Sequence, residues 1–186
     1  MRCLICGVWN LNGLICKKCM PTLSLGKRLV DGVSVYSFYA FSEIEFLLHF
    51  KYQPIGSRIM TVLARWASLY FSQNFSFPHG LVGVGIDDRI KNGYSHTGII
   101  LHQFKRCGIQ PIYGELKAKN PVSYAGKSLQ YRQANPKGFQ TQLVSRDVVV
   151  MDDVITTGVS LQEAIGLLRS KNNRVILALT LCDARR

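Results

Sequence analysis

Two pairs of cysteines stand near the start of the chain, and their spacing is typical of a metal site. Cys3 and Cys6 form one Cys-x-x-Cys pair, and Cys16 and Cys19 form the other. Zn²⁺ binds four thiolates in a tetrahedron, and each such turn offers two sulfur atoms on one side. Because protein ligands would fill the whole shell, the pattern predicts a structural zinc site. A redox pair or free thiols are the alternatives, and clustered cysteines in a cytosolic chain favour zinc.

An acid pair followed by a Thr-Thr-Gly turn forms a second group of residues able to do chemistry. The apolar run Val148–Met151 precedes it and is typical of a buried strand. Backbone N–H groups where a turn opens a helix bind phosphate, and two carboxylates can accept hydrogen bonds from vicinal sugar hydroxyls. The alternative is a capped helix beside a surface acid pair. The predicted site for a 5-phosphoribosyl group comprises Asp152, Asp153, Thr156, Thr157, Gly158, Val159 and Ser160.

The segment between residues 117 and 137 is basic, with tyrosines interleaved. Single-stranded nucleic acid binds where cations follow the phosphate backbone and aromatic rings stack on bases. Three interpretations stay open: a nucleic-acid surface, a lid over a substrate, or a solvated loop. The candidate nucleic-acid-binding residues are Lys117, Lys119, Tyr124, Lys127, Arg132 and Lys137, with Lys17 and Lys18 in the cysteine segment.

The formal net charge of +12 is distributed unevenly along the 186 residues. Residues 1–30 and 115–140 hold most of the excess, whereas residues 141–186, which carry the Thr-Thr-Gly turn, are nearly neutral. A phosphate loop built from backbone N–H groups needs no side-chain charge. We therefore expect two anionic partners: a phosphoribosyl ligand in the neutral part, and a polyanion, single-stranded DNA above all, on the basic segments.

Hydrophobic periodicity predicts the elements that position these residues. A strand, turn, helix and strand over residues 148–181 form a βαβ unit, which places the turn at the carboxyl edge of a parallel sheet. Ser160 and Glu163 have the spacing of a capping box for the helix of this unit, and Gly83 permits close backbone approach in its strand. The other predicted elements are strands over 33–39, 81–86 and 109–113, helices over 42–50, 57–71 and 96–106, and a long loop over 116–138.

The length suits one main domain with a small appendage. Residues 1–30 are predicted to form a zinc ribbon with its connector, and residues 31–186 the main domain. No apolar run reaches the ~18 residues that span a bilayer, and the N-terminus lacks the apolar stretch of a signal peptide. A cytoplasmic protein without a transmembrane segment is therefore expected.

The segment Val148–Ser160 closely resembles the signature with which type I phosphoribosyltransferases bind 5-phosphoribosyl 1-diphosphate (PRPP). Together with the cysteine pairs, it makes the chain resemble the ComF family of competence proteins. Lys51 and Tyr52 resemble a Lys-aromatic step of that family, and Arg89 and Lys91 could supply phosphate-binding charge. Residues that resemble the family's region before the PRPP strand are Gly126, Ser128, Arg132, Asn135 and Phe139. The implied fold is α/β, a type I phosphoribosyltransferase-like parallel sheet flanked by helices, after a small four-Cys zinc ribbon.

The resemblance also implies a function. A ComF-like protein would bind PRPP and single-stranded DNA, hold structural Zn²⁺, and handle incoming DNA in the cytosol during natural transformation, with other DNA-uptake proteins as partners. A phosphoribosyltransferase acting on an unidentified base or small-molecule acceptor is the second hypothesis. In that enzyme Mg²⁺ would bridge the diphosphate, and Asp152 and Asp153 would hold the ribose, with no catalytic base or nucleophile evident. A zinc-ribbon interaction module on a fold without its ligand is the third.

Overall fold

The computed structural model describes residues 1–186 except residues 12, 78–79, 88, 91–92, 125 and 186. Lys91, named above as a source of phosphate-binding charge, lies outside the described residues. No helix among the described residues is long and apolar enough to cross a membrane.

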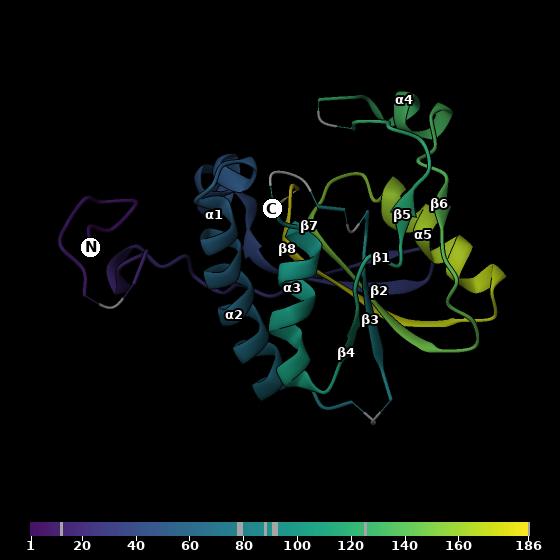
Figure 1. The fold of residues 1–186 in the computed structure, drawn as a ribbon, viewed down its shortest axis with the longest axis horizontal. Coiled ribbons are helices and arrows are strands. Elements are labelled where there is room, and N and C mark those ends of the chain that lie inside the picture. The colour runs from purple at the N-terminus through teal and green to yellow at the C-terminus, as the bar shows by residue number, and fades with distance from the viewer. Residues whose placement is uncertain (12, 78–79, 88, 91–92, 125, 186) are drawn as a thin grey trace.

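A six-stranded sheet in the order β1-β2-β8-β7-β3-β4 forms the centre of the molecule (Figure 1). Strand β1 is antiparallel to β2, and every other neighbouring pair is parallel. The parallel α/β architecture predicted from the sequence is thus confirmed. The strands are β1 (Gly26–Val30), β2 (Val33–Ala40), β3 (Val82–Gly85), β4 (Gln110–Ile112), β7 (Asp147–Ile155) and β8 (Arg174–Asp183).

Helices cover both faces of this sheet, which explains why its central strands are continuous apolar runs. Along β7, Val149 and Met151 pack with the helices of one face, and Val148 and Val150 pack against α5 on the other. The first face carries α1 (Phe41–Leu48), α2 (Gly56–Asn74) and α3 (His96–Phe104), and the second α5 (Val159–Ser170) (Figure 1). Short 3₁₀ helices are η1 (Lys17–Cys19), η2 (His49–Tyr52) and η3 (Lys105–Cys107).

The N-terminal cysteine segment lies beside α1 and α2, at one end of the molecule (Figure 1). Leu14 and Ile15 are buried in the same apolar cluster as the residues of α1 and α2. Strand β1, which precedes the predicted boundary at residue 30, pairs with β2 in the central sheet. The cysteine segment is therefore packed onto the main domain.

The segment predicted as a long basic loop contains short elements and projects from the sheet (Figure 1). We call residues 117–140 the hood. Strands β5 (Lys117–Ala118) and β6 (Phe139–Gln140) pair antiparallel at its base, and α4 (Leu129–Ala134) forms its outer part. Helix α4 has no buried residue. Polar contacts, rather than a core of its own, must therefore position it.

The capping box predicted for α5 is wrong. The helix begins after Gly158, which has φ of 87°, and no side chain caps its N-terminus. Glu163 instead accepts hydrogen bonds from the backbone N–H groups of Lys137, Gly138 and Phe139 (3.0, 2.5 and 3.3 Å). The carboxylate satisfies three amides of the hood, so it serves a tertiary contact and not the start of its own helix.

Gly83 and Gly166 provide a matched test of the packing. A Cβ on Gly83 would lie 2.9 Å from side-chain carbons of both Ile109 and Leu101, whereas one on Gly166, exposed on α5, would have nothing within 4 Å. Gly83→Ala should therefore lower the free energy of unfolding by about 1–3 kcal/mol. Gly166→Ala should raise it by about 0.5–1 kcal/mol, because alanine favours the helix. Urea unfolding measures both, and a stable Gly83→Ala variant would contradict the packing.

Candidate functional site

The predicted phosphoribosyl motif surrounds a small hollow at the carboxyl edge of the sheet. Strand β7 continues through both aspartates to Ile155, and the turn over residues 156–158 leads into α5. The hollow has a volume of about 30 Å³. It is lined by Asp152 and by each predicted residue from Thr156 to Ser160. The structure thus gathers the acid, the two threonines and the helix start around one point, as a phosphate loop requires.

Asp153 turns instead toward Lys51, which lies on η2. The Lys51 Nζ is 2.9 Å from a carboxylate oxygen of Asp153, and the two side chains are 24% and 13% exposed. Burial alone would raise the pKa of Asp153, but the Lys51 ammonium lowers it below its usual value. Burial likewise opposes the charge of Lys51, yet the carboxylate raises the pKa of that lysine. This pair balances one of the two adjacent acidic charges.

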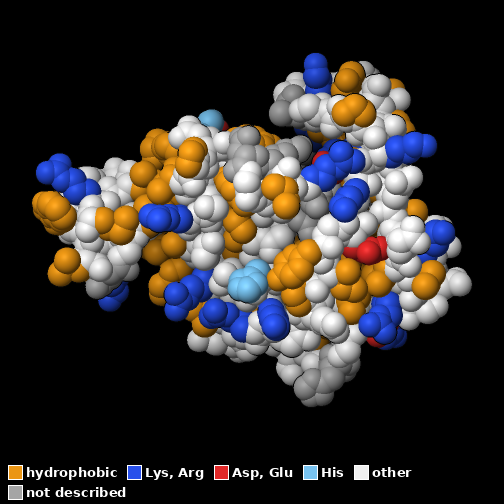
Figure 2. All heavy atoms as spheres, in the orientation of Figure 1, with side chains coloured by type: hydrophobic (Ala, Val, Ile, Leu, Met, Phe, Trp, Pro, Cys, Tyr) orange, Lys and Arg blue, Asp and Glu red, His pale blue; other side chains and the backbone are white. Residues whose placement is uncertain are grey.

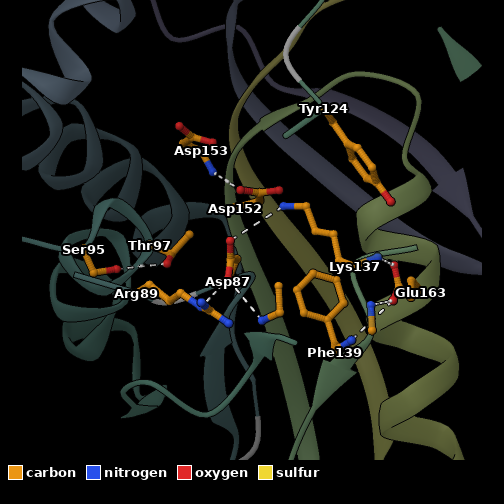
Figure 3. A network of polar contacts seen from close by, with 12 residues as sticks. Asp87, Arg89, Ser95, Thr97, Tyr124, Lys137, Phe139, Asp152, Asp153 and Glu163 are labelled. Atoms are coloured by element: carbon orange, nitrogen blue, oxygen red, sulfur yellow. Dashed lines mark hydrogen bonds and ion pairs between the residues drawn. The ribbon is translucent and has the colours of Figure 1, made fainter. Parts of the chain in front are cut away.

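Asp152 lines the hollow and forms no ion pair with any residue that the structure describes. Burial, and then the adjacent charge of Asp153, raise the pKa of Asp152 well above its usual value, although Lys137 opposes the shift. The backbone N–H of Asp153 donates to Asp152 at 2.8 Å (Figure 3). A carboxylate held here gains from donors that a ligand brings, such as sugar hydroxyls.

Asp87, just after β3, joins the site to the hood, and sequence reasoning missed it. Its carboxylate accepts a hydrogen bond from the backbone N–H of Ala118 on β5 at 3.1 Å. It also pairs with Arg89 at 3.2 Å and with Lys137 at 3.9 Å (Figure 3). Lys137 thus points inward from the hood toward two aspartates, Asp87 and Asp152. No spacing rule links these residues, so the sequence carried no signal for this contact.

Two arginines contact the Thr-Thr-Gly turn from opposite directions. Arg28 on β1 donates to the Thr156 carbonyl oxygen at 2.9 Å and pairs with Asp183 at 3.2 Å. Arg132 on α4 donates from one terminal nitrogen to the hydroxyls of Thr156 and Thr157, at 2.5 and 3.3 Å. The Thr-Thr-Gly turn therefore has two guanidinium groups beside it. Both arginines belong to the basic segments of the chain. The charge distribution predicted a polyanion, and not the phosphoribosyl ligand, as the partner of those segments.

The predicted nucleic-acid residues divide into outward and inward groups. Lys117, Lys119, Lys127, Lys17 and Lys18 are exposed, and basic side chains gather over the hood and the N-terminal segment (Figure 2).

The inward group consists of Tyr124, Arg132 and Lys137. Tyr124 is a buried residue, only 8% exposed, and both cations lie over its ring, so in this conformation it offers no open face to a base. Tyr131, which was not among the predicted contacts, is 39% exposed and lies 5.2 Å from Lys127 Nζ. It is therefore the aromatic ring of α4 available for stacking.

The four N-terminal cysteines come together as predicted. Their sulfur atoms all lie within 4.8 Å of one another. Backbone N–H groups of Cys6 and then Cys16 lower the pKa of Cys3 to about 6, which favours its thiolate. Side-chain hydrogen bonds with Cys6 and then Cys16 raise the pKa of Cys19 to about 12, which favours its thiol in the absence of a metal. Four thiols at this spacing can hold one metal ion, and this donor set fits Zn²⁺. The remaining cysteines, Cys107 and Cys182, lie elsewhere in the fold.

A larger cavity of about 850 Å³ lies outside the phosphate loop, between α3 and the end of β4. Tyr113 and His102, which are hydrogen-bonded to each other at 3.2 Å, line this cavity, and so do Arg89 and Tyr94. Tyr94 also donates to the Lys51 carbonyl oxygen. We locate the candidate site at the smaller hollow because Asp152, the two threonines and Arg132 converge there.

No protein-family model matches the chain. Over 64 residues, 31% of its length, the chain is 34% identical to an orotate phosphoribosyltransferase of Sulfurisphaera tokodaii, and this segment spans 33% of that protein. The solved structure of adenine phosphoribosyltransferase from Saccharomyces cerevisiae is 12% identical, with a TM-score of 0.43, over 86% of this chain and 83% of that one. The allosteric regulatory enzyme of purine biosynthesis is 15% identical, with a TM-score of 0.46, over 66% of this chain and 26% of that one.

The parallel sheet and the similarity to the orotate enzyme define a type I phosphoribosyltransferase-like fold. The chain adds to it an N-terminal four-cysteine cluster. The segment that matches the orotate phosphoribosyltransferase spans about a third of the length of that enzyme.

The two adjacent aspartates should respond oppositely to neutralisation. Asp153→Asn leaves Lys51 without its partner, so at pH 7 it should lower the free energy of unfolding by roughly 1–3 kcal/mol, less than a fully buried pair would lose. Asp152→Asn should raise stability at pH 7, because the raised pKa means that ionising Asp152 costs more in the folded state.

The Asp152 difference should disappear as the pH falls to the ordinary aspartate pKa of about 4, because its folded-state pKa lies above that value. The Asp153 difference should persist at about pH 4 and shrink only below it, because its folded-state pKa lies lower. Above that pH the wild type gains stability from Asp153 and loses it from Asp152. Urea unfolding at pH 7 and at about pH 4 measures the two variants. Shifts of the same sign at pH 7 would contradict the assignment of separate roles.

The cysteine cluster should bind about one zinc ion per chain. Cys16→Ser should lose most of the bound zinc, because three thiolates leave the shell open, whereas Cys107→Ser should retain it. Metal analysis of the purified proteins by mass spectrometry measures the content. Zinc retained in full by Cys16→Ser, or absent from the wild type, would refute the site.

Proposed function

We propose that this protein is a ComF-like competence protein that binds PRPP at the phosphate loop and single-stranded DNA on its basic surfaces. In this role it handles incoming DNA in the cytosol during natural transformation, alongside other proteins of DNA uptake. The observation that carries the ligand assignment is the convergence of Asp152, residues 156–160 and Arg132 on one hollow. The competence role rests on the family resemblance.

The ligand assignment follows from complementary chemistry. The 5-phosphate of PRPP would accept hydrogen bonds from the backbone N–H groups at the start of α5 and from the hydroxyls of Thr156 and Thr157. Asp152, on the same hollow, would accept from a ribose hydroxyl. Asp153 would act indirectly, because its ion pair holds the Lys51 side chain beside the carboxyl end of β7.

The DNA assignment rests on outward-facing charge. Lys119 and Lys127 are exposed on the hood, where the half-exposed Tyr131 ring lies beside Lys127, and Lys17 and Lys18 are exposed on η1. Cations of this kind bind phosphates without sequence preference, and an exposed ring stacks on any base. We assign structural Zn²⁺ to the four cysteines, which hold the short N-terminal segment together.

A phosphoribosyltransferase is the second candidate, and the large cavity favours it. Its volume of about 850 Å³ could admit a heteroaromatic acceptor. An acceptor nitrogen would attack C1 of PRPP, the C1–O bond would break, and diphosphate would leave. Asp87 and Asp152 offer carboxylates of the kind that bind Mg²⁺ at a diphosphate. Diphosphate release with a panel of bases would support this function, and PRPP binding without turnover would favour the first.

Calorimetry with PRPP tests the ligand assignment. Asp152→Asn should weaken PRPP binding about 10- to 100-fold, which is the usual range for a lost hydrogen bond to a charged group. Asp147→Asn is the matched control, because Asp147 lies at the other end of β7 and pairs with Arg174 on the surface. Equal PRPP affinity for the Asp152→Asn variant and the wild type would reject the assignment.

Salt dependence tests the DNA assignment. The logarithm of the association constant for a single-stranded oligonucleotide should fall linearly with the logarithm of salt concentration. Lys119→Gln and Lys127→Gln should each reduce the slope by about 0.7, the value for one phosphate contact on a single strand. Lys171→Gln, an exposed substitution at the end of α5, should leave the slope unchanged. Affinity independent of salt would rule out an electrostatic interface.

A further inference from the structure

We infer that Arg132 is a phosphate-binding residue that the hood supplies to the phosphate loop, and that it couples the phosphoribosyl ligand to nucleic-acid binding. The inference rests on the proposed function for the identity of both ligands. It adds a direction to their relationship: each should strengthen the binding of the other.

The geometry places the Arg132 guanidinium at the hollow itself. Arg132 lines the hollow of about 30 Å³ together with Asp152 and the Thr156–Ser160 turn. One of its terminal nitrogens donates to both threonine hydroxyls that the proposed 5-phosphate would contact. A phosphate seated on this turn would therefore meet Arg132 without any large movement of α4.

Arg132 is also a principal attachment of α4. The helix has six residues, none of them buried, so apolar packing contributes little to its position. The Nε of Arg132 donates to the Lys127 carbonyl oxygen at 3.0 Å, and its own carbonyl accepts from the Tyr124 hydroxyl at 3.1 Å. The first bond connects the guanidinium to the backbone at Lys127, and the second holds the backbone of Arg132 itself. Whatever holds the guanidinium therefore also holds this part of the hood.

A phosphate would hold the Arg132 guanidinium more strongly than the two neutral threonine hydroxyls do. Hydrogen bonds between a guanidinium and phosphate oxygens are charge-assisted at both ends and are roughly twice as strong as neutral ones. Ligand binding should thus fix α4 against the loop. Lys127 and Tyr131, which the DNA assignment uses, belong to the same short segment as Arg132. Fixing α4 lowers the entropy that DNA binding must remove, so DNA should bind more tightly.

The opposite sign is the physical alternative. If Arg132 only fills the hollow, a phosphate must displace it, α4 loses its attachment, and PRPP weakens DNA binding. Thermodynamic reciprocity means that one titration decides between the two signs, because each ligand changes the affinity of the other by the same factor.

The test measures a labelled single-stranded oligonucleotide by fluorescence anisotropy, at fixed salt and without Mg²⁺, with and without saturating PRPP. In the wild type, PRPP should tighten oligonucleotide binding by about fivefold or more, the usual lower range of such coupling. In Arg132→Gln, the factor should fall to about one. Arg169→Gln is the control, because Arg169 is an arginine of α5 whose partner is the exposed Asp31, and it should keep the wild-type factor.

The outcomes separate the inference from the proposed function. Failure of the wild type to bind PRPP or the oligonucleotide would reject the proposed function. If the wild type binds both ligands, two results would overturn the role of Arg132 and leave the proposed function intact. One is a coupling factor of one or below in the wild type, and the other is an undiminished coupling factor in Arg132→Gln.

A second measurement needs no variant. Hydrogen exchange of the wild-type hood over residues 128–135 should slow when ribose 5-phosphate is added, since this probe carries the 5-phosphate without the diphosphate. Unchanged or faster exchange, with ribose 5-phosphate shown to bind, would equally overturn the inference.

Discussion

The ion pair between Lys51 and Asp153 is the interaction on which the rest of the site depends. Two consecutive aspartates at the end of a buried central strand would repel each other and lose hydration. Lys51 offsets one charge, and this leaves Asp152 facing the hollow. The backbone oxygen of Lys51 in turn accepts hydrogen bonds from Tyr94 and His96. One lysine thereby connects the segment after α1 and the segment after β3 to strand β7 itself.

The few acidic residues of this basic chain also position the hood. Glu163 receives three of its backbone N–H groups, and Asp87 receives a fourth from Ala118. Neither carboxylate belongs to the hood, and residues 117–140 contain no acidic residue. The acids that attach the hood are therefore supplied by α5 and by the segment after β3, and the hood itself carries only basic charge.

Sequence patterns predicted the parts of the molecule that local forces determine. The apolar run before Asp152 gave a buried strand, and the cysteine spacing anticipated the cluster of four sulfurs. Contacts between distant segments could not be predicted in this way. Glu163 has capping-box spacing but serves the hood, and Asp87 and Arg28 act on residues far along the chain. The sequence pattern predicts a loop for the hood, because the elements of the hood are too short and polar to show a hydrophobic period.

The burial of Leu14 and Ile15 has a consequence for the whole protein. These residues lie just before Cys16, and they belong to the core that α1 and α2 share. A metal ion held by the four cysteines would therefore stabilise the central domain as well as the N-terminal segment, in proportion to the logarithm of its free concentration. The cell's supply of zinc, or an oxidant that removes the thiols, would then set how much folded protein is present.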